Sequence, residues 1–449
     1  MAETAIIGGG ISGLATAYFL EQNGAKDIIL LEAGAETGGK LKTRKTQHYL
    51  IEEGPDAYVA AKPVIGKLIE KLDLQQEVIA PQHNTFFIYS GKKLQEVPAG
   101  LSALVPADIG AFLRTELISW QGKIRLVLER LVPSAKGTED ESLAAFIERR
   151  FGREMLQKLA GPLFAGIHAG GANELSLEAS FPQFRKMEKE FGSITKAVLT
   201  RRKQNPTPPP IFHSFKNGMQ TLPDAIRQHL KQTSVIMGAK VRSIAYFRDK
   251  WHIQTESTQI EAEKVILAVP AFTASEILSQ LDKPLSAALG SIRHSSSTII
   301  TFGFRQEQVQ NPLKGTGFLV PAPEQENISA VTFSSAKWAG RAAQAHVLFR
   351  AFLNKNKKFR KTDTESIMGS VQKELSGILG IEGVPELTDL RHWANGQPVY
   401  DMEHLQRVNH IETLLLQHPG IHVTGASYRG AGIADCVRQA KEVAEKVSA

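Results

Sequence analysis

Three glycines near the start of the chain have the types and spacing needed to bind a dinucleotide. A glycine at the first position permits a tight turn, the second lets the backbone approach a pyrophosphate, and the third lets a helix and a strand pack closely. The amino end of the helix then faces the phosphates. The predicted binding turn consists of Gly8, Gly9, Gly10, Ile11, Ser12 and Gly13.

A carboxylate that could bind the ribose of a dinucleotide follows this turn in the sequence. Glu32 comes nineteen residues after Gly13 and ends a second apolar run, where a carboxylate accepts hydrogen bonds from a ribose diol. Ala33 follows it, and Gly39 and Lys40 come shortly afterwards. Because this second glycine segment offers backbone N–H groups and a cation to the phosphates, the sequence favours FAD over NAD.

The elements that position these residues read as strand, turn, helix and strand. An apolar run over 4–8, a helical pattern over 11–22 and a second apolar run over 28–31 predict one β-α-β unit of a parallel sheet. From residue 98 to about 199 the pattern turns helical, and a proline-rich connector over 205–210 ends it. Later strands are predicted at 240–247, 251–255, 264–269, 298–304 and 347–352, with a helix at 364–379.

Two motifs at opposite ends of the chain resemble one superfamily. The segment 32–43 resembles the double-glycine segment of flavin amine oxidases, phytoene desaturases and protoporphyrinogen oxidases, with Glu36 and Lys40 where arginines are commonest. The segment 423–436 resembles the flavin-closing motif of the same proteins. Its glycines would pass beneath the isoalloxazine, and a helix beginning at Gly432, Ile433 and Ala434 would aim N–H groups at the flavin.

Four further segments, 53–58, 165–170, 180–183 and 393–400, look specifically like the Gram-positive porphyrinogen oxidases. This resemblance implies an FAD-dependent oxidase that converts coproporphyrinogen III to coproporphyrin III, or protoporphyrinogen IX to protoporphyrin IX, in heme biosynthesis. It implies three hydride transfers to flavin N5, reoxidation by O₂ with release of H₂O₂, and no catalytic side chain. The additional flavin contacts that it implies are Gly54, Pro55, Asp56, Ala57, Val241 and Trp393.

The predicted fold is mixed α/β (α+β): a Rossmann-type FAD-binding domain of the amine-oxidase and glutathione-reductase kind, a β-sheet substrate domain and a helical insertion. We expect the FAD-binding domain to comprise 1–80, 214–272 and 408–449. The substrate domain would comprise 81–97 and 273–407, and the helical insertion 98–213. An amine oxidase or carotenoid desaturase on the same scaffold remains an alternative, as does a porphyrin carrier without catalytic activity.

Cations are needed to bind the substrate's propionates. Candidates are Lys62, Arg185 and Arg293, and Ile167 is a candidate substrate contact. The amphipathic stretch 101–132, with Trp120, is expected to pack within the helical insertion, and contact with a membrane or a partner is the alternative.

The formal charge of +7 favours anionic partners. Basic residues gather at 185–203 and 355–361, but no nucleic-acid-binding signature accompanies them, so we expect solvated surfaces. Cys436 is the single cysteine and is expected to be a packed residue, and His168 has no neighbouring ligands for a metal. We expect a cytoplasmic protein with at most peripheral contact with the inner membrane face, which hands its product to a ferrochelatase.

Overall fold

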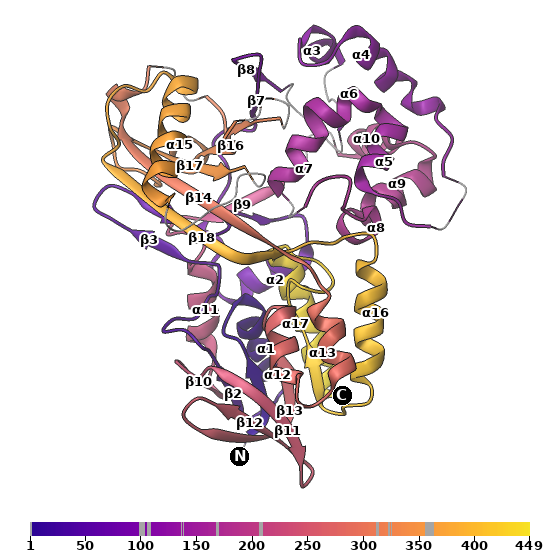
Figure 1. Ribbon diagram of the computed structural model, residues 1–449, viewed down its shortest axis with the longest axis vertical. Coiled ribbons are helices and arrows are strands. Elements are labelled where there is room, and N and C mark those ends of the chain that lie inside the picture. The colour runs from indigo at the N-terminus through magenta and orange to yellow at the C-terminus, as the bar shows by residue number, and fades with distance from the viewer. Residues whose placement is uncertain are drawn as a thin grey trace.

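The computed structural model describes the chain except residues 1, 98–103, 106–108, 136, 138, 168–169, 206–209, 311–313, 322–323, 325 and 355–362. Four features of the sequence analysis fall outside the described residues: the start of the helical stretch, His168, most of the proline-rich connector and the second basic cluster. The molecule is elongated, with the N-terminus and one sheet at one end and a second sheet and a group of helices at the other (Figure 1).

The glycine turn belongs to a sheet built mainly from parallel strands. Its parallel part runs β10 (Thr233–Ile236), β2 (Ile28–Leu31), β1 (Ala2–Ile7), β13 (Gln259–Leu267) and β19 (Ile421–Val423). The strands β11 (Val241–Phe247) and β12 (Lys250–Thr255) extend the amino-terminal half of β13 in antiparallel fashion. This sheet brings residues from the two ends of the chain side by side.

Alternate residues of the parallel strands point into two apolar layers. Ile6 packs with helices α1 (Ile11–Gln22), α2 (Pro63–Lys71), α11 (Thr221–His229) and α17 (Ile433–Ser448) on one face. Ile7 packs on the other face with α12 (Ala271–Leu278), α13 (Lys283–Gly290) and α16 (His404–Leu415). A parallel sheet covered on both faces explains why its strands are apolar on both sides.

A second sheet lies in the half of the molecule opposite the N-terminus (Figure 1). Its order is β18 (Leu387–Pro398), β14 (His294–Arg305), β17 (His346–Leu353), β16 (Ile328–Phe333), β15 (Gly317–Leu319), β7 (Phe87–Ser90) and β8 (Lys93–Glu96). Helix α15 (Thr364–Leu379) packs against it, and α14 (Ser334–Lys337) follows β16. Smaller ladders pair β3 (Thr43–Lys45) with β4 (Leu50–Glu52), and β9 (Phe212–Phe215) with β5 (Tyr58–Val59) and β6 (Val78–Ile79).

A group of helices with its own apolar core occupies the described part of 104–205. Its members are α3 (Ile109–Arg114), α4 (Trp120–Val127), η2 (Leu128–Leu131), α5 (Leu143–Phe151), α6 (Arg153–Met155), η3 (Leu156–Ala160), α7 (Gly161–Ile167), α8 (Leu177–Ser180), α9 (Pro182–Phe191) and α10 (Ile194–Gln204). Short 3₁₀ segments are η1 (Gln75–Glu77) and η4 (Gln306–Gln308). Within the described residues, no helix is long and apolar enough to cross a bilayer.

The mixed α/β fold expected from the sequence is confirmed. Most predicted strands lie within one or two residues of the observed ones at their carboxyl ends, and the helix at 364–379 matches α15. The strand predicted at 264–269 begins earlier, at Gln259, because its first half pairs with β12 and is polar on one side. Strands β7, β8, β15, β16 and β18 had no prediction.

Candidate cofactor and substrate site

The turn between β1 and α1 is closely packed on one side and open on the other. Gly8 has φ +110°, which favours glycine, and a Cβ on Gly13 would lie 1.9 Å from the Gly8 carbonyl oxygen. A Cβ on Gly10 would meet only the Gly39 Cα, at 3.9 Å. No side chain caps the first turn of α1, so its backbone N–H groups suit an anionic group.

Glu32 lies at the carboxyl end of β2 beside this turn. Its two carboxylate oxygens accept the backbone N–H groups of Gly9 and Gly34, each at 2.7 Å. The Ala239 N–H donates to the Glu32 carbonyl oxygen at 2.8 Å, which brings the buried start of β11 at Val241 close to the same place. The carboxylate is therefore held in one orientation by the protein itself. Ala33, the next residue, is exposed.

The double-glycine segment lies directly against the turn. The Gly38 N–H donates to the Gly9 carbonyl oxygen at 2.8 Å, and a Cβ on Gly39 would lie 3.1 Å from the Gly10 Cα. Burial lowers the pKa of the Lys40 ammonium, which is also near the Cys436 thiol. Lys40 thus places a half-buried cation beside the double-glycine segment and near Cys436 of α17.

Residues 53–54 connect this region to the second sheet. A Cβ on Gly54 would lie 2.0 Å from the Lys40 carbonyl oxygen, so these two backbones are in close contact. Arg350 of β17 donates to the Gly54 carbonyl oxygen. The indole N–H of Trp393, on β18, donates to the Glu53 carbonyl oxygen at 2.7 Å. The second sheet therefore fixes the position of the predicted flavin-binding backbone.

The Asp56 carboxylate is bound by two residues that follow strand β16 of the second sheet. It accepts hydrogen bonds from the Lys337 ammonium and the Trp338 indole, both at 2.9 Å. Burial alone would raise the pKa of Asp56, but the charge of Lys337 helps to hold it well below its usual value. Pro55 is exposed and Ala57 is half-buried. A cofactor contact at Asp56 would therefore involve the backbone rather than the carboxylate.

The two ends of the chain meet at the amino ends of α1 and α17. Gly425 has φ +121°, and a Cβ there would lie 3.3 Å from the Ser12 hydroxyl. Ser12 also hydrogen-bonds the Cys436 thiol, in the first turn of α17. Gly432 precedes α17, and no side chain caps that helix. The uncapped amino ends of α1 and α17 thus lie in one region, where their backbone N–H groups can face an anionic group, as the glycine motifs predict.

Tyr400 holds the loop before α17 in place. Its hydroxyl accepts the Gly430 N–H at 2.9 Å and donates to the Ala426 carbonyl oxygen at 2.7 Å. Its ring stacks on that of His404, with centroids 3.9 Å apart. The sequence analysis gave Tyr400 no role. Neither did it single out Arg350, although a charged residue inside the apolar strand 347–353 is a signal that could have identified it.

Two of the predicted substrate cations have acidic partners near this region. Lys62 forms an ion pair with Asp435, in the first turn of α17. Arg293 precedes β14 and forms an ion pair with Glu174 at 3.3 Å. The side chain of Ile167 lies outside the described residues.

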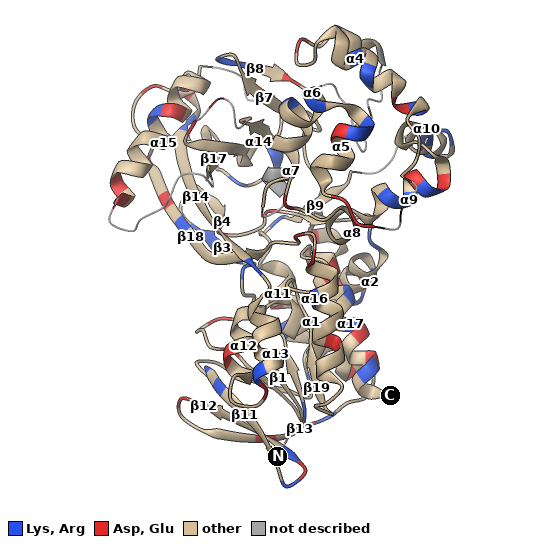
Figure 2. Ribbon diagram, turned by 45° about the vertical axis from the view of Figure 1, so that its right-hand side comes forward, with Lys and Arg blue, Asp and Glu red and all other residues tan. Residues whose placement is uncertain are grey.

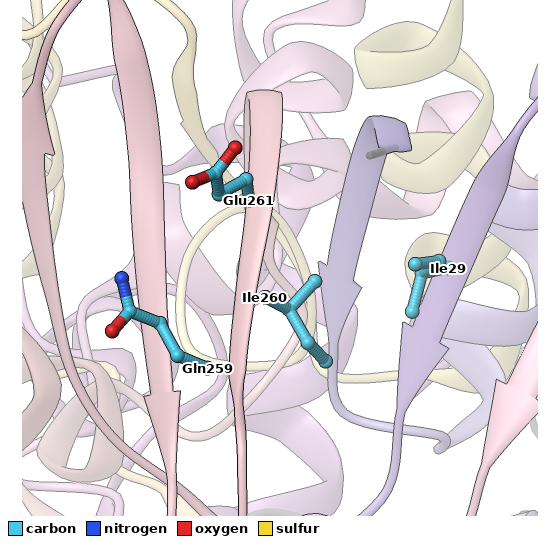
Figure 3. Close-up of a pocket in the computed structure, with 4 residues that line it drawn as sticks. All are labelled: Ile29, Gln259, Ile260 and Glu261. Carbon is cyan, nitrogen blue, oxygen red and sulfur yellow. The ribbon is translucent and has the colours of Figure 1, made fainter.

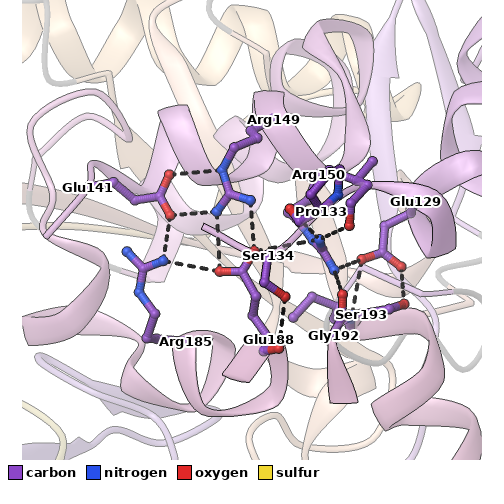
Figure 4. Close-up of polar contacts among 12 residues, drawn as sticks. Glu129, Pro133, Ser134, Glu141, Arg149, Arg150, Arg185, Glu188, Gly192 and Ser193 are labelled. Carbon is purple, nitrogen blue, oxygen red and sulfur yellow. Dashed lines mark hydrogen bonds and ion pairs between the residues drawn. The ribbon is translucent and has the colours of Figure 1, made fainter. Parts of the chain in front are cut away.

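Arg185 is buried inside the helical group and cannot serve as a surface anchor. Its guanidinium lies 2.9 Å from Glu141 and 3.1 Å from Glu188 (Figure 4). Arg149 pairs with the same two carboxylates. Because its charge is already compensated away from solvent, we correct the prediction and remove Arg185 from the substrate candidates.

A surface hollow elsewhere does not belong to this site. It has a volume of about 470 Å³ and is lined by Ile29, Gln259, Ile260 and Glu261 (Figure 3). Strand register pairs Ala262 with the first residue of β1 and Leu267 with its last, so the hollow lies toward the amino ends of the strands. Ligands of parallel sheets bind at the carboxyl ends, where the glycine turn is.

The described residues contain no group of three or more His, Cys, Asp or Glu side chains arranged to hold a metal ion. The site instead offers an open glycine turn, an oriented carboxylate and two uncapped helix amino ends, which fit a dinucleotide whose middle is anionic. These features define a dinucleotide-binding flavoprotein.

The chain belongs to the flavin containing amine oxidoreductase family, which matches residues 11–448. It is an FAD-dependent oxidoreductase, as the sequence predicted. It is 31% identical to the coproporphyrinogen III oxidase of Bacillus subtilis over 97% of this chain and 96% of the relative. It is 30% identical to the enzyme of that name from Staphylococcus aureus, over 99% and 98% of the two chains. A solved structure from Exiguobacterium, provisionally named a protoporphyrinogen oxidase, superposes with a TM-score of 0.87 at 28% identity, covering 100% and 98% of the chains.

Proposed function

We propose that this protein oxidises coproporphyrinogen III to coproporphyrin III in heme biosynthesis, with O₂ as the final acceptor and H₂O₂ as the second product. The observation that carries this proposal is the similarity to coproporphyrinogen III oxidases along nearly the whole of both chains. Protoporphyrinogen IX is a second candidate substrate, since the similar Exiguobacterium structure bears the protoporphyrinogen name.

The residues proposed to hold FAD surround the meeting point of the two chain ends. When bound, FAD supplies the two-electron acceptor for the reaction. Glu32 would bind the ribose, and the amino end of α1 would face the pyrophosphate. The proposed set is Gly8, Gly9, Gly10, Ile11, Ser12, Gly13, Glu32, Ala33, Gly39, Lys40, Gly54, Pro55, Asp56, Ala57, Val241, Trp393, Gly432, Ile433 and Ala434.

The protein's main tasks toward the substrate are orientation and charge compensation. No side-chain base is required, because adjacent pyrroles stabilise the cation left when a bridging methylene loses hydride. Lys62 and Arg293 are the cations that we propose for the propionates. The half-buried Lys62 pairs with Asp435, and the exposed Arg293 lies 3.3 Å from Glu174 and 4.0 Å from Asp401. A propionate would replace Asp435 or Glu174 as the partner of the cation.

Cytoplasmic location, at most peripheral membrane contact and transfer of the porphyrin to a ferrochelatase complete the proposal.

The decisive experiment follows porphyrin fluorescence in air after coproporphyrinogen III or protoporphyrinogen IX is added to the purified FAD-loaded protein. We expect coproporphyrin to form with consumption of O₂, and anaerobic mixing to bleach the flavin absorbance. Oxidation of benzylamine with neither porphyrinogen oxidised would identify an amine oxidase instead. A flavin that stays unbleached on anaerobic mixing with both porphyrinogens would identify a carrier.

Variants at the two proposed cations test the propionate contacts. Lys62→Met and Arg293→Met should each raise KM for coproporphyrinogen roughly tenfold with little change in kcat, because a binding charge is lost. Lys67→Met, in helix α2 directly after Lys62, removes an exposed lysine as a control. An unchanged KM in both variants would refute these assignments.

A further inference from the structure

Arg350 is a buried cation that forms no ion pair with any carboxylate in the part of the chain that the structure describes. Its side chain is only 2% exposed. The other arginines that are buried in the described ranges each pair with a glutamate, and they are Arg150, Arg185 and Arg341. A buried charge without a compensating partner is costly, so the position of Arg350 calls for an anion that the protein itself does not supply.

The strand that carries Arg350 directs it toward the predicted cofactor site. Side chains of β17 alternate between the two faces of the second sheet, and Phe349 and Ala351 pack with α15 on one of them. Arg350 points to the opposite face, where its guanidinium donates to the Gly54 carbonyl oxygen. Strand β17 lies in the half of the molecule opposite the N-terminus, and α1 and α17 lie in the other half (Figure 1, Figure 2). Arg350 thus contacts, from the second sheet, the backbone that is proposed to touch FAD.

The charged groups around Arg350 leave one positive charge in excess. The Lys337 ammonium lies 2.9 Å from the Asp56 carboxylate, and Arg341 lies 3.2 Å from Glu52. Burial would raise the pKa of Asp56, but the charges of Lys337 and, after it, of Arg350 hold it well below its usual value. Both carboxylates therefore already have a cationic partner, even when Glu52 is counted as ionised.

The remaining carboxylate of this backbone segment does not compensate Arg350 either. Glu53 precedes Gly54, and its two oxygens pair with Arg391 and Arg44. The excess charge therefore lies directly beside the Gly54 backbone.

We propose that Arg350 compensates the negative charge of reduced FAD and so raises the reduction potential of the bound cofactor. Transfer of hydride to neutral FAD moves two electrons and one proton and leaves the cofactor with one negative charge. A fixed cation in a buried place of low dielectric constant stabilises such a charge without reorganising. The inference rests on the proposed FAD contact at Gly54 and deepens the proposed function, because a stronger acceptor favours oxidation of the porphyrinogen.

A substrate propionate is the other anion to be considered as the partner of Arg350. A propionate needs open access to the two-pronged edge of a guanidinium, and Arg350 is only 2% exposed. Its charge, by contrast, acts on FAD across the Gly54 backbone without direct contact. Burial therefore favours the cofactor, and Arg350 tunes FAD rather than acting as a catalytic residue.

Reduction potentials of the FAD-loaded protein, measured without porphyrinogen, test this proposal. We expect the midpoint potential of the unmodified protein to lie above that of free FAD. In Arg350→Gln the amide still donates to the Gly54 carbonyl oxygen but the charge is lost. Reduced FAD should then bind about tenfold more weakly relative to oxidised FAD, which lowers the potential of this two-electron couple by about 30 mV. Arg350→Lys retains the charge and should keep the potential close to that of the unmodified protein.

Arg305→Gln is the matched control. Arg305 ends the neighbouring strand β14, but its side chain is 56% exposed and its guanidinium lies 2.7 Å from Glu386. Removal of its charge should leave the potential unchanged, because solvent and salt screen exposed charges. Equal potentials in the unmodified protein and Arg350→Gln, or equal shifts in Arg350→Gln and Arg305→Gln, would overturn the proposal.

Kinetics with coproporphyrinogen separate the two anions. A higher KM in Arg350→Gln with an unchanged potential would assign a propionate to Arg350 and would also overturn the proposal. If Arg350→Gln does not fold, the unmodified protein still provides a test, since a midpoint potential at or below that of free FAD would contradict the stabilising charge. A loaded protein with the expected potentials that oxidises no porphyrinogen would sink the proposed function and leave this inference standing.

Discussion

The Glu32 carboxylate and the Gly9 backbone N–H are joined by a 2.7 Å hydrogen bond that ties the end of β2 to the glycine turn. Glu32→Gln keeps the shape of the side chain but replaces one accepting oxygen with a donor and removes the charge. Because hydrogen bonds to a charged group contribute about 1.5–3 kcal/mol, we expect FAD affinity to fall about 10- to 100-fold. Titration of the apoprotein with FAD measures the change.

The matched control for this substitution is Glu36→Gln. Glu36 is exposed, and its carboxylate lies 3.6 Å from the Lys42 ammonium in a surface pair that contributes little. FAD affinity should be unchanged. Wild-type affinity in Glu32→Gln would contradict the ribose role.

Gly13 tests the close contact between α1 and β1. A Cβ at this position would lie 1.9 Å from the Gly8 carbonyl oxygen, so Gly13→Ala must displace the turn. We expect the purified variant to lack FAD absorbance and to melt at a lower temperature. Gly66 lies inside α2, and a Cβ there would have no atom within 4 Å. Gly66→Ala should therefore keep FAD, and its free energy of unfolding should rise by about 0.5–1 kcal/mol. Full FAD content in Gly13→Ala would refute the argument.

The parts of the site that depend on local sequence could be predicted, and the parts that depend on the second sheet could not. Gly8, Gly13 and Glu32 lie in the turn between β1 and α1 and at the end of the next strand, β2. Their spacing in the sequence is therefore enough to predict that they lie together. The pairing of Arg350 with Gly54 joins residues almost 300 positions apart, and no local pattern encodes it.

Burial separates the useful predictions from the wrong ones in the helical group. The stretch 101–132 was expected to pack within the helical group, but Trp120 and Leu131, on one face of α4 and η2, are exposed. This face and Arg185 were both misjudged, because an apolar face is usually buried and an arginine is usually exposed. Both exceptions arise near the same ion-pair network, which takes charged side chains inside. The periodicity of apolar residues predicts that a helix has an apolar face, but it does not show whether that face meets the core or solvent.

Cys436 provides a probe of the contact between α1 and α17. Burial raises the pKa of its thiol to about 11, so little reactive thiolate exists at pH 8. We expect the native FAD-loaded protein to resist a thiol reagent at that pH and the urea-unfolded protein to react fully. The apoprotein should react faster than the loaded protein, because bound FAD would hold the two helix ends together. Rapid labelling of the native loaded protein would contradict this packing.

Arg150 tests the energetic role of the buried network. Arg150→Met would leave Glu129 buried without its ion-pair partner, and we expect a loss of about 3–5 kcal/mol in the free energy of unfolding. Arg153→Met removes an exposed arginine that pairs with Glu148 and should change that free energy by less than about 1 kcal/mol. Urea unfolding measures both, and similar losses in the two variants would show that the buried pair contributes nothing special.

The same network predicts how stability depends on pH. Burial alone would raise the pKa of Glu129, but hydrogen bonds from Ser193 and Thr195 and the charge of Arg150 hold it below its usual value of 4.5. A carboxyl with a depressed folded pKa stabilises the fold fully above its unfolded pKa, and this contribution is lost as pH falls through the folded value. The protein should therefore lose stability below about pH 4.5, and Glu129→Gln should lose less over the same interval because it has no proton to bind there. Urea midpoints measured from pH 6 to pH 3 test this, and equal pH slopes in the two proteins would assign the acid sensitivity to other carboxylates.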